Sequence, residues 1–145
     1  MKADYKKVIE ESHERCRKLG IPEDLVYSRK ILDQAELQKK FAESRDMILT
    51  ASPYMEQLIN LRGHNFFALL ADGEGCILNA IGDEKILSEA FDLKMVPGAY
   101  MSEESIGTNA MAIVIKTGEP VQLSGKDHYI KAYHKWTCSG APIRD

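Results

Sequence analysis

Apolar residues in the N-terminal part of the chain recur at three-, four- and seven-residue intervals, the spacing of a helix with one buried face. Residues 8–19 follow this spacing, with Val8, Ile9, Cys16 and Leu19 as the apolar positions. Charged residues 10–18 occupy the remaining positions and predict a solvated face with weak ion pairs. Gly20 followed by Pro22 is typical of a helix end.

A second apolar stripe extends over residues 35–59 and predicts further helix. Pro53 interrupts this stripe, because proline lacks an amide donor and crowds the preceding turn. The pattern leaves two alternatives: the helix kinks here, or Ser52 caps a new helix with Pro53 at its first position. Gly63 is the predicted end of the helical segment.

From residue 66 the pattern changes to short apolar runs. Residues 66–71 and 76–81 are two such runs, and Asp72-Gly73-Glu74-Gly75 separates them, which predicts a β-hairpin. A helix is then expected over residues 83–91. Further along, helical character is expected at residues 105–116 and 127–134, and strands at 121–123 and 137–143.

Length and composition fit a single globular domain. The 145 residues are 44% hydrophobic and 28% charged, with a formal net charge of -3. This charge gives no general reason to expect nucleic-acid binding. Neither a bilayer-spanning apolar run nor a signal-peptide core is recognisable, so a cytoplasmic location is expected.

Five segments resemble, in order, the N-terminal GAF sensor domains of sigma-54-dependent transcriptional activators, particularly the regulators of acetoin catabolism. They are ESHERC at residues 11–16, GIP at 20–22, ESIGTNA at 104–110, DHY at 127–129 and HKWTCSGAPI at 134–143. The resemblance covers nearly the whole chain. It implies an α+β fold of the PAS/GAF type, in which N-terminal helices pack on one face of an antiparallel sheet and a ligand pocket lies on the other.

In that fold, residues 1–62 would form a helical lead-in that supplies dimer contacts, and residues 63–145 the GAF-like core. In the family, further strands follow the position that corresponds to residue 145, so the chain is expected to be an excerpt of a longer regulator. Its missing strands would be replaced by self-association or rearrangement. The implied ligand-binding residues are Phe67, Leu69, Tyr100, Ser105, Asn109, His128, Tyr133, Trp136 and Cys138.

The function that the resemblance implies is regulatory and non-enzymatic. An unidentified small-molecule effector would shift the conformation of a homodimer, and the change would pass to an attached AAA+ ATPase module that remodels sigma-54 RNA polymerase. This chain has no phosphate-binding loop motif and no basic helix-turn-helix segment. ATP hydrolysis and DNA binding are therefore expected from other domains, and no cofactor is specified.

Residues 105–110 could bind an anion at a helix start, because the first amides of a helix lack intrahelical partners. The structural alternative is that Ser102 or Ser105 caps the helix while Asn109 holds a neighbouring loop.

Three other interpretations stay open. His128, His134 and Cys138 could hold a metal or haem in a redox or gas sensor, although their spacing matches no known zinc finger. Cys76 and Cys138 could act as in the GAF-type reductases of free methionine sulfoxide, which needs an activated thiolate. Finally, aromatic side chains could fill the cavity of a purely structural dimerisation module. The odd count of three widely spaced cysteines itself favours buried, reduced thiols.

Overall fold

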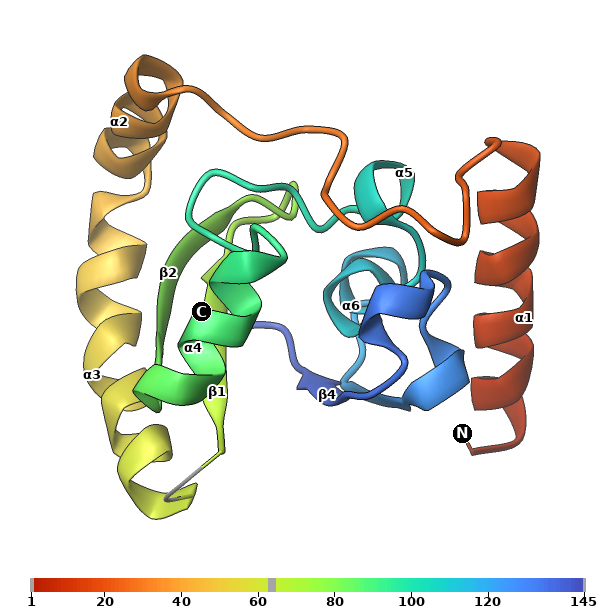
Figure 1. Ribbon diagram of the computed structural model, residues 1–145. Coiled ribbons are helices and arrows are strands. Elements are labelled where there is room, and N and C mark those ends of the chain that lie inside the picture. The colour runs from red at the N-terminus through yellow and green to blue at the C-terminus, as the bar shows by residue number, and fades with distance from the viewer. Residues whose placement is uncertain (1, 63–64, 145) are drawn as a thin grey trace. The chain divides into compact units, whose positions relative to one another are not determined.

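The computed structural model describes residues 2–62 and 65–144 of the chain, which divide into two compact units (Figure 1). The first unit combines the N-terminal residues 1–29 with residues 101–145, and the second unit is residues 30–100. The boundary expected between residues 62 and 63 lies inside the second unit, and the predicted helix end at Gly63 lies outside the described residues.

The first unit contains three α-helices, two short 3-10 helices and a two-stranded antiparallel sheet. In chain order they are α1 (Lys2–Lys18), α5 (Glu103–Ile106), α6 (Ala110–Thr117), β3 (Val121–Ser124), η1 (Gly125–Asp127), η2 (Lys131–Tyr133) and β4 (Thr137–Gly140). Leu123 pairs with Cys138 at the middle of the sheet. Segment 105–116, expected as one helix, is divided because Gly107 takes a φ of 84° and Asn109 then starts α6.

Helix α1 contributes one buried face to the core of this unit. Ile9 packs with Ala110, Ile113 and Leu123, and Cys138 lies against the same cluster. One and two turns further along, Ser12 and Cys16 are also fully buried. The expectation of a solvated charged face over residues 10–18 was therefore wrong in part, because polar and charged side chains of this run enter buried contacts described below.

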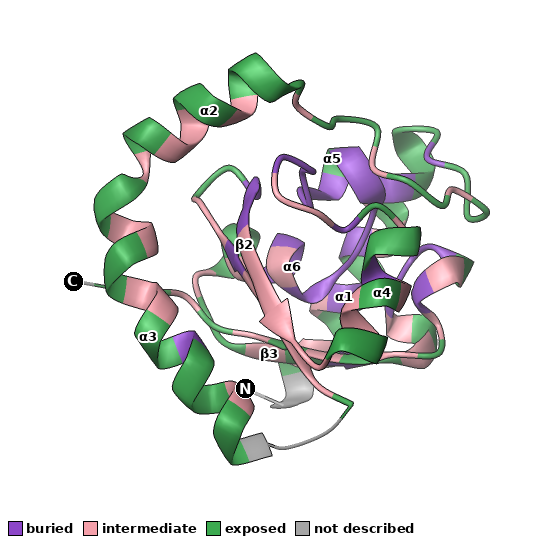
Figure 2. Cartoon of the chain, turned by 60° about the vertical axis from the view of Figure 1, so that its left-hand side comes forward, coloured by how far each residue is buried: buried purple, intermediate pink, exposed green. Residues whose placement is uncertain are grey.

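The second unit is a β-hairpin covered by helices. It consists of α2 (Gln34–Glu43), α3 (Arg45–Arg62), β1 (Phe67–Ala71), β2 (Ile77–Gly82) and α4 (Glu84–Asp92). Helix α3 packs on the hairpin, where Met55 forms a buried cluster with Leu70 and Leu78. Helix α2 has no buried residue, and the outer sides of α2 and α3 are largely exposed (Figure 2).

The hairpin turn forms where the glycine-rich tetrapeptide predicts it. The Asp72 carboxylate accepts hydrogen bonds from the backbone amides of Glu74 and Cys76, each at 3.0 Å, and Gly75 takes a φ of 91°. Lys40 on α2 also pairs with Asp72 at 2.8 Å and with Glu74 at 2.7 Å. These two carboxylates raise the pKa of Lys40, so its ammonium group stays charged at neutral pH and pairs with the turn.

Pro53 lies inside α3 and does not begin a new helix, so the capping alternative for Ser52 was wrong. The Ser52 hydroxyl instead donates back to the carbonyl of Ile48 at 2.6 Å. The break between the two helices lies at Ser44, the C-cap of α2. The helical stripe was therefore correct, and the other alternative, a kink at Pro53, stays a prediction.

The prediction of a mixed α and β fold with antiparallel pairing is confirmed. Among the described residues, however, the four strands form two separate two-stranded sheets, β1 with β2 and β3 with β4. Strand β4 ends at Gly140 rather than continuing to residue 143. Within residues 2–62 and 65–144, no helix is both long and apolar enough to cross a membrane.

Candidate functional site

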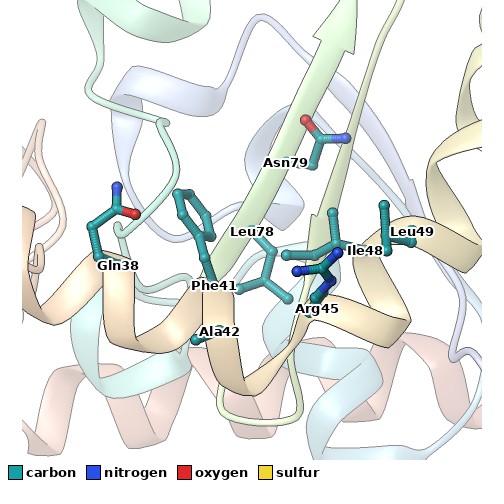
Figure 3. A pocket seen from close by; sticks show the side chains of 8 residues that line it. All are labelled: Gln38, Phe41, Ala42, Arg45, Ile48, Leu49, Leu78 and Asn79. Atoms are coloured by element: carbon teal, nitrogen blue, oxygen red, sulfur yellow. The ribbon is translucent and has the colours of Figure 1, made fainter.

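Two surface hollows stand out, one in each unit, and they differ in chemistry. The apolar hollow of the second unit is an open depression lined by residues of α2, α3 and β2, with a volume of about 490 Å³ (Figure 3). Phe41, Ile48, Leu49 and Leu78 supply its apolar wall. None of the nine side chains expected to bind a ligand lines this hollow.

The basic hollow of the first unit has a similar volume, about 470 Å³, within the range of small-molecule sites. It is lined by three histidines, three permanent cations, one carboxylate and one tyrosine: His13, His128, His134, Arg17, Lys126, Lys131, Glu23 and Tyr129. Positive charge thus gathers here on a chain whose formal net charge is -3. The basic hollow is our candidate functional site.

The three histidines fix the backbone of the loop at η1. His13 Nε2 lies 2.8 Å from the carbonyl of Asp127, and His134 Nε2 lies 3.0 Å from that of His128. His128 Nδ1 lies 3.0 Å from the carbonyl of Gly125. Because a carbonyl only accepts hydrogen bonds, each of these ring nitrogens carries a proton and donates it. The ordering of this loop therefore depends on three imidazoles.

His128 is the most constrained of the three. Its side chain is 1% exposed, and its ring meets that of Tyr133 edge-to-face at 5.9 Å. Tyr133 in turn stacks on Trp136 at 5.6 Å. Burial lowers the pKa of His128, and the neighbouring His134 and His13 lower it further. The hydrogen bond to the Gly125 carbonyl and the charge of Asp127 raise the pKa, but they do not outweigh burial. The imidazole is accordingly neutral at pH 7, with its proton on Nδ1.

The side chains of Asp127, Tyr5 and Tyr129 make further hydrogen bonds that hold the loop. The Asp127 carboxylate accepts from the backbone amide of Ser124 at 3.0 Å and from the Tyr5 hydroxyl at 3.4 Å. The Tyr129 hydroxyl donates to the carbonyl of Ile21 at 2.6 Å. Segments 11–16, 20–22 and 127–129, recognised separately in the sequence, are thus joined by direct contacts.

A buried carboxylate connects α1 to α5. Glu103 is 3% exposed and accepts hydrogen bonds from Arg15 at 2.6 and 2.9 Å and from Ser12 at 2.6 Å. Ser12 also bonds to Thr108 at 2.6 Å. Burial raises the pKa of the Glu103 carboxyl, but the Arg15 and Ser12 hydrogen bonds outweigh it and hold the pKa below its usual range. Glu103 is therefore an ionised, fully paired structural group.

Asn109 and Ser105 occupy structural positions at the helix starts. Asn109 Oδ1 caps α6 by accepting from Ala112 N at 3.1 Å, while Nδ2 donates to the carbonyls of Met101 and Gly107. The Ser105 hydroxyl bonds to that of Ser102 at 2.7 Å. The observed contacts correspond to the structural alternative for this segment, although they do not test a ligand role.

The nine expected ligand-binding residues are divided between the units. Phe67, Leu69 and Tyr100 belong to the second unit, and the other six to the first. Of those six, the structure brings His128, Tyr133 and Trp136 into one aromatic group, and Cys138 joins the apolar cluster around Ile9. His128 alone of the nine lines the basic hollow.

The thiols are poorly suited to nucleophilic chemistry. Burial raises the pKa of Cys16 and Cys76, and it raises that of Cys138 to about 11. A reactive thiolate needs the opposite shift. A metal site also lacks support here: across the described part of the chain, no three His, Cys, Asp or Glu side chains converge as possible ligands.

Sequence reasoning missed most of the basic hollow. His13 and Arg17 lie on α1 and Lys126 on η1, and only the approach of these two elements in the fold reveals the charge cluster. Arg15 and Glu103 were missed for the same reason, since 88 positions separate them. The one available signal was that His13 falls within the recognised ESHERC segment.

Comparison with known proteins identifies relatives among transcriptional regulators. The family described as MimR, N-terminal domain, matches residues 8–145. The acetoin dehydrogenase operon transcriptional activator AcoR of Bacillus subtilis is 37% identical over 97% of this chain and 24% of its own length. A signal-transduction and transcriptional-control protein of Clostridium beijerinckii is 34% identical over 97% of this chain and 22% of its own length.

The fold also has a counterpart of known structure. A chain in the crystal structure of the Escherichia coli DhaR(N)-DhaL complex superimposes with a TM-score of 0.88, at 23% identity, over 95% of this chain and 47% of that one. The present chain spans about a quarter of the length of the curated relatives named above. From the family match over residues 8–145, this chain belongs to the family of MimR N-terminal domains.

Proposed function

We propose that this chain is a GAF-type sensor domain of a sigma-54-dependent transcriptional activator. Its relatives include transcriptional activators, and their remaining length leaves room for the ATPase and DNA-binding modules that such a regulator uses. The observation that carries the proposal is the match to an activator's N-terminal domain over residues 8–145. The sensor itself would be non-enzymatic and would act in the cytoplasm.

In this proposal the effector is a small molecule that binds the first unit at the basic hollow. The hollow is bordered by α1 and the η1 loop, and His13 on α1 contacts this loop directly. A ligand that displaces the loop would therefore act on α1 as well. It would shift the domain between two conformations only as far as its affinities for them differ. An attached AAA+ module would then respond to the position of the helices.

The proposed active assembly is a homodimer in which the exposed apolar residues of α3 meet a second copy. Leu49, Tyr54 and Leu61 are all strongly exposed on this helix, and each would lose contact with water at such an interface. The remaining expected ligand residues, Phe67, Leu69 and Tyr100, stay candidates for a pocket within the second unit.

Native mass spectrometry of the freshly purified chain tests the sensor proposal. We expect an excess mass that disappears on denaturation, or, if the pocket is purified empty, a metabolite that raises the melting temperature in a thermal-shift screen. A chain with no excess mass and no stabilising compound across a broad metabolite set would contradict a small-molecule sensor.

A further inference from the structure

His128, which lines the basic hollow, carries an unusual group, its ring nitrogen Nε2. Among the described residues, it is the one buried side-chain nitrogen or oxygen without a hydrogen-bond partner. The other nitrogen of the ring, Nδ1, donates to the carbonyl of Gly125. In the neutral ring Nε2 is therefore an acceptor that receives no hydrogen bond, which is unfavourable in a buried position.

The charges around this nitrogen favour an anion. Arg17, Lys126 and Lys131 line the hollow against a single carboxylate, that of Glu23. The nearby Asp127 carboxylate is already engaged by Ser124 N. An anion in the hollow would thus meet three cationic side chains.

We propose that the basic hollow binds a small oxyanion, a phosphate or a carboxylate, and that His128 takes up one proton at Nε2 to donate a hydrogen bond to it. The proposal names the ligand class of the sensor proposed above and rests on that function for its biological role. Protonation converts Nε2 from an unsatisfied acceptor into a charged donor, and a charge-assisted hydrogen bond is about twice as strong as a neutral one.

The protein alone keeps His128 neutral. Burial lowers the pKa of the ring, and the imidazoles of His134 and His13 oppose its charge. Asp127 and the Gly125 carbonyl act in the other direction, and the Tyr133 ring meets the imidazole edge-to-face. An anion beside Nε2 adds the missing negative charge and raises the pKa of His128, so that binding and proton uptake are coupled.

Binding also requires movement, because Nε2 itself is out of contact with solvent. An oxyanion reaches it only when side chains that line the hollow shift. The bound and unbound states therefore differ in loop conformation, which is the property that a sensor needs.

Titration of the 145-residue chain with sulfate tests the coupling, since sulfate keeps its charge between about pH 6 and pH 8, where histidine titrates. Calorimetry in buffers of different ionisation enthalpy should show uptake of close to one proton. The affinity should rise as the pH falls, by up to about tenfold per pH unit. Parallel titrations with inorganic phosphate and acetate show which kind of oxyanion binds more tightly.

Charge-reversal variants supply the matched control. Lys126→Glu/Lys131→Glu changes two exposed side chains of the hollow and should weaken sulfate binding at least tenfold. Lys39→Glu/Lys85→Glu makes the same change in net charge at exposed positions of the second unit and should leave binding within about twofold, because neither residue lines the hollow. His128→Gln, if it folds by its melting curve, should bind without proton uptake.

Equal weakening of sulfate binding in both double variants would show that the chain attracts sulfate only through its net charge. That result would overturn the proposal. Saturable binding without proton uptake would overturn the role of His128, and no saturable binding would overturn the site itself. Neither result bears on the sensor function, which the native mass spectrum tests independently. Conversely, sulfate binding that follows the expected pattern, together with a failed metabolite search, would support the site and contradict the sensor function.

Discussion

Arg15 and Glu103 form a two-point ion pair between α1 and α5, with Nε–Oε1 and Nη2–Oε2 distances of 2.6 and 2.9 Å. The carboxylate is buried, whereas the guanidinium is 40% exposed. Loss of the carboxylate would therefore let Arg15 return to water but leave Ser12 in the interior without this partner. Substitution of Glu103 should therefore destabilise the chain more than substitution of Arg15.

Glu103→Gln is expected to destabilise the chain by about 2 kcal/mol, because it removes charge-assisted hydrogen bonds from a buried position. Urea unfolding followed by circular dichroism measures the change. Glu14→Gln is the matched control, since Glu14 pairs with Arg17 on the exposed side of the same helix. That variant should lose much less stability than Glu103→Gln, and an equal loss in both would show that burial is irrelevant.

The stability of the chain should fall in two stages as the pH decreases. His128 has a folded pKa below its ordinary 6.5, so the unfolded chain binds its proton first and stability declines below about pH 6.5. Glu103 has a folded pKa below its ordinary 4.5, so its contribution is lost only as the pH falls further. Melting temperatures measured from neutral to acid pH test this order.

His128→Gln should abolish the first stage and keep the second, whereas Glu103→Gln should do the reverse. Stability that is constant between about pH 7 and pH 5 would contradict the buried neutral imidazole.

Asn109→Ala should cost about 2 kcal/mol, since it removes the cap of α6 together with donors to two buried carbonyls. Asn109→Ser keeps an oxygen at the cap and should recover part of the loss. Asn60→Ala, at an exposed position of α3, serves as the control and should be nearly neutral. Thermal unfolding gives the ranking, and an unchanged melting temperature in Asn109→Ala would remove the structural role.

The cysteines should resist alkylation in the folded protein. With a pKa of about 11, Cys138 has a thiolate fraction at neutral pH roughly 100-fold below that of an ordinary thiol of pKa 9.0. Intact-mass analysis during iodoacetamide treatment should show slow labelling at Cys138 and labelling of Cys16 and Cys76 only on unfolding. Rapid modification of the native chain would reopen the case for cysteine catalysis.

Self-association should depend on the exposed apolar residues of α3. Leu61 is 79% exposed, and Leu49→Glu/Leu61→Glu should convert a dimer to a monomer in analytical ultracentrifugation without lowering the melting temperature appreciably. Ile143→Glu, at an exposed apolar position in the first unit, should leave the association unchanged. A wild-type chain that is monomeric at high concentration would contradict the proposed dimer.

Local patterns predicted the elements well, because each depends on neighbours in the chain. The hairpin turn at Asp72 and the helix that ends at Asp92 lie within a residue or two of their predicted places. Pairings between distant residues were not predictable in this way. Nothing local distinguishes Arg15 from the other charges of α1, and its burial partner lies 88 positions away. The basic hollow depends on the same kind of long-range approach, so the sequence indicated only some of its residues, chiefly His128 and His134.

The division of the chain into a continuous and a discontinuous unit has a consequence for biosynthesis. Residues 30–100 are consecutive, so the ribosome releases everything that the second unit needs in one stretch. The first unit must wait until the polypeptide beyond residue 101 has emerged, while α1 stays without Glu103 and Thr108. Because domains fold as their segments become available during translation, we expect residues 30–100 to begin folding before residues 1–29 meet residues 101–145.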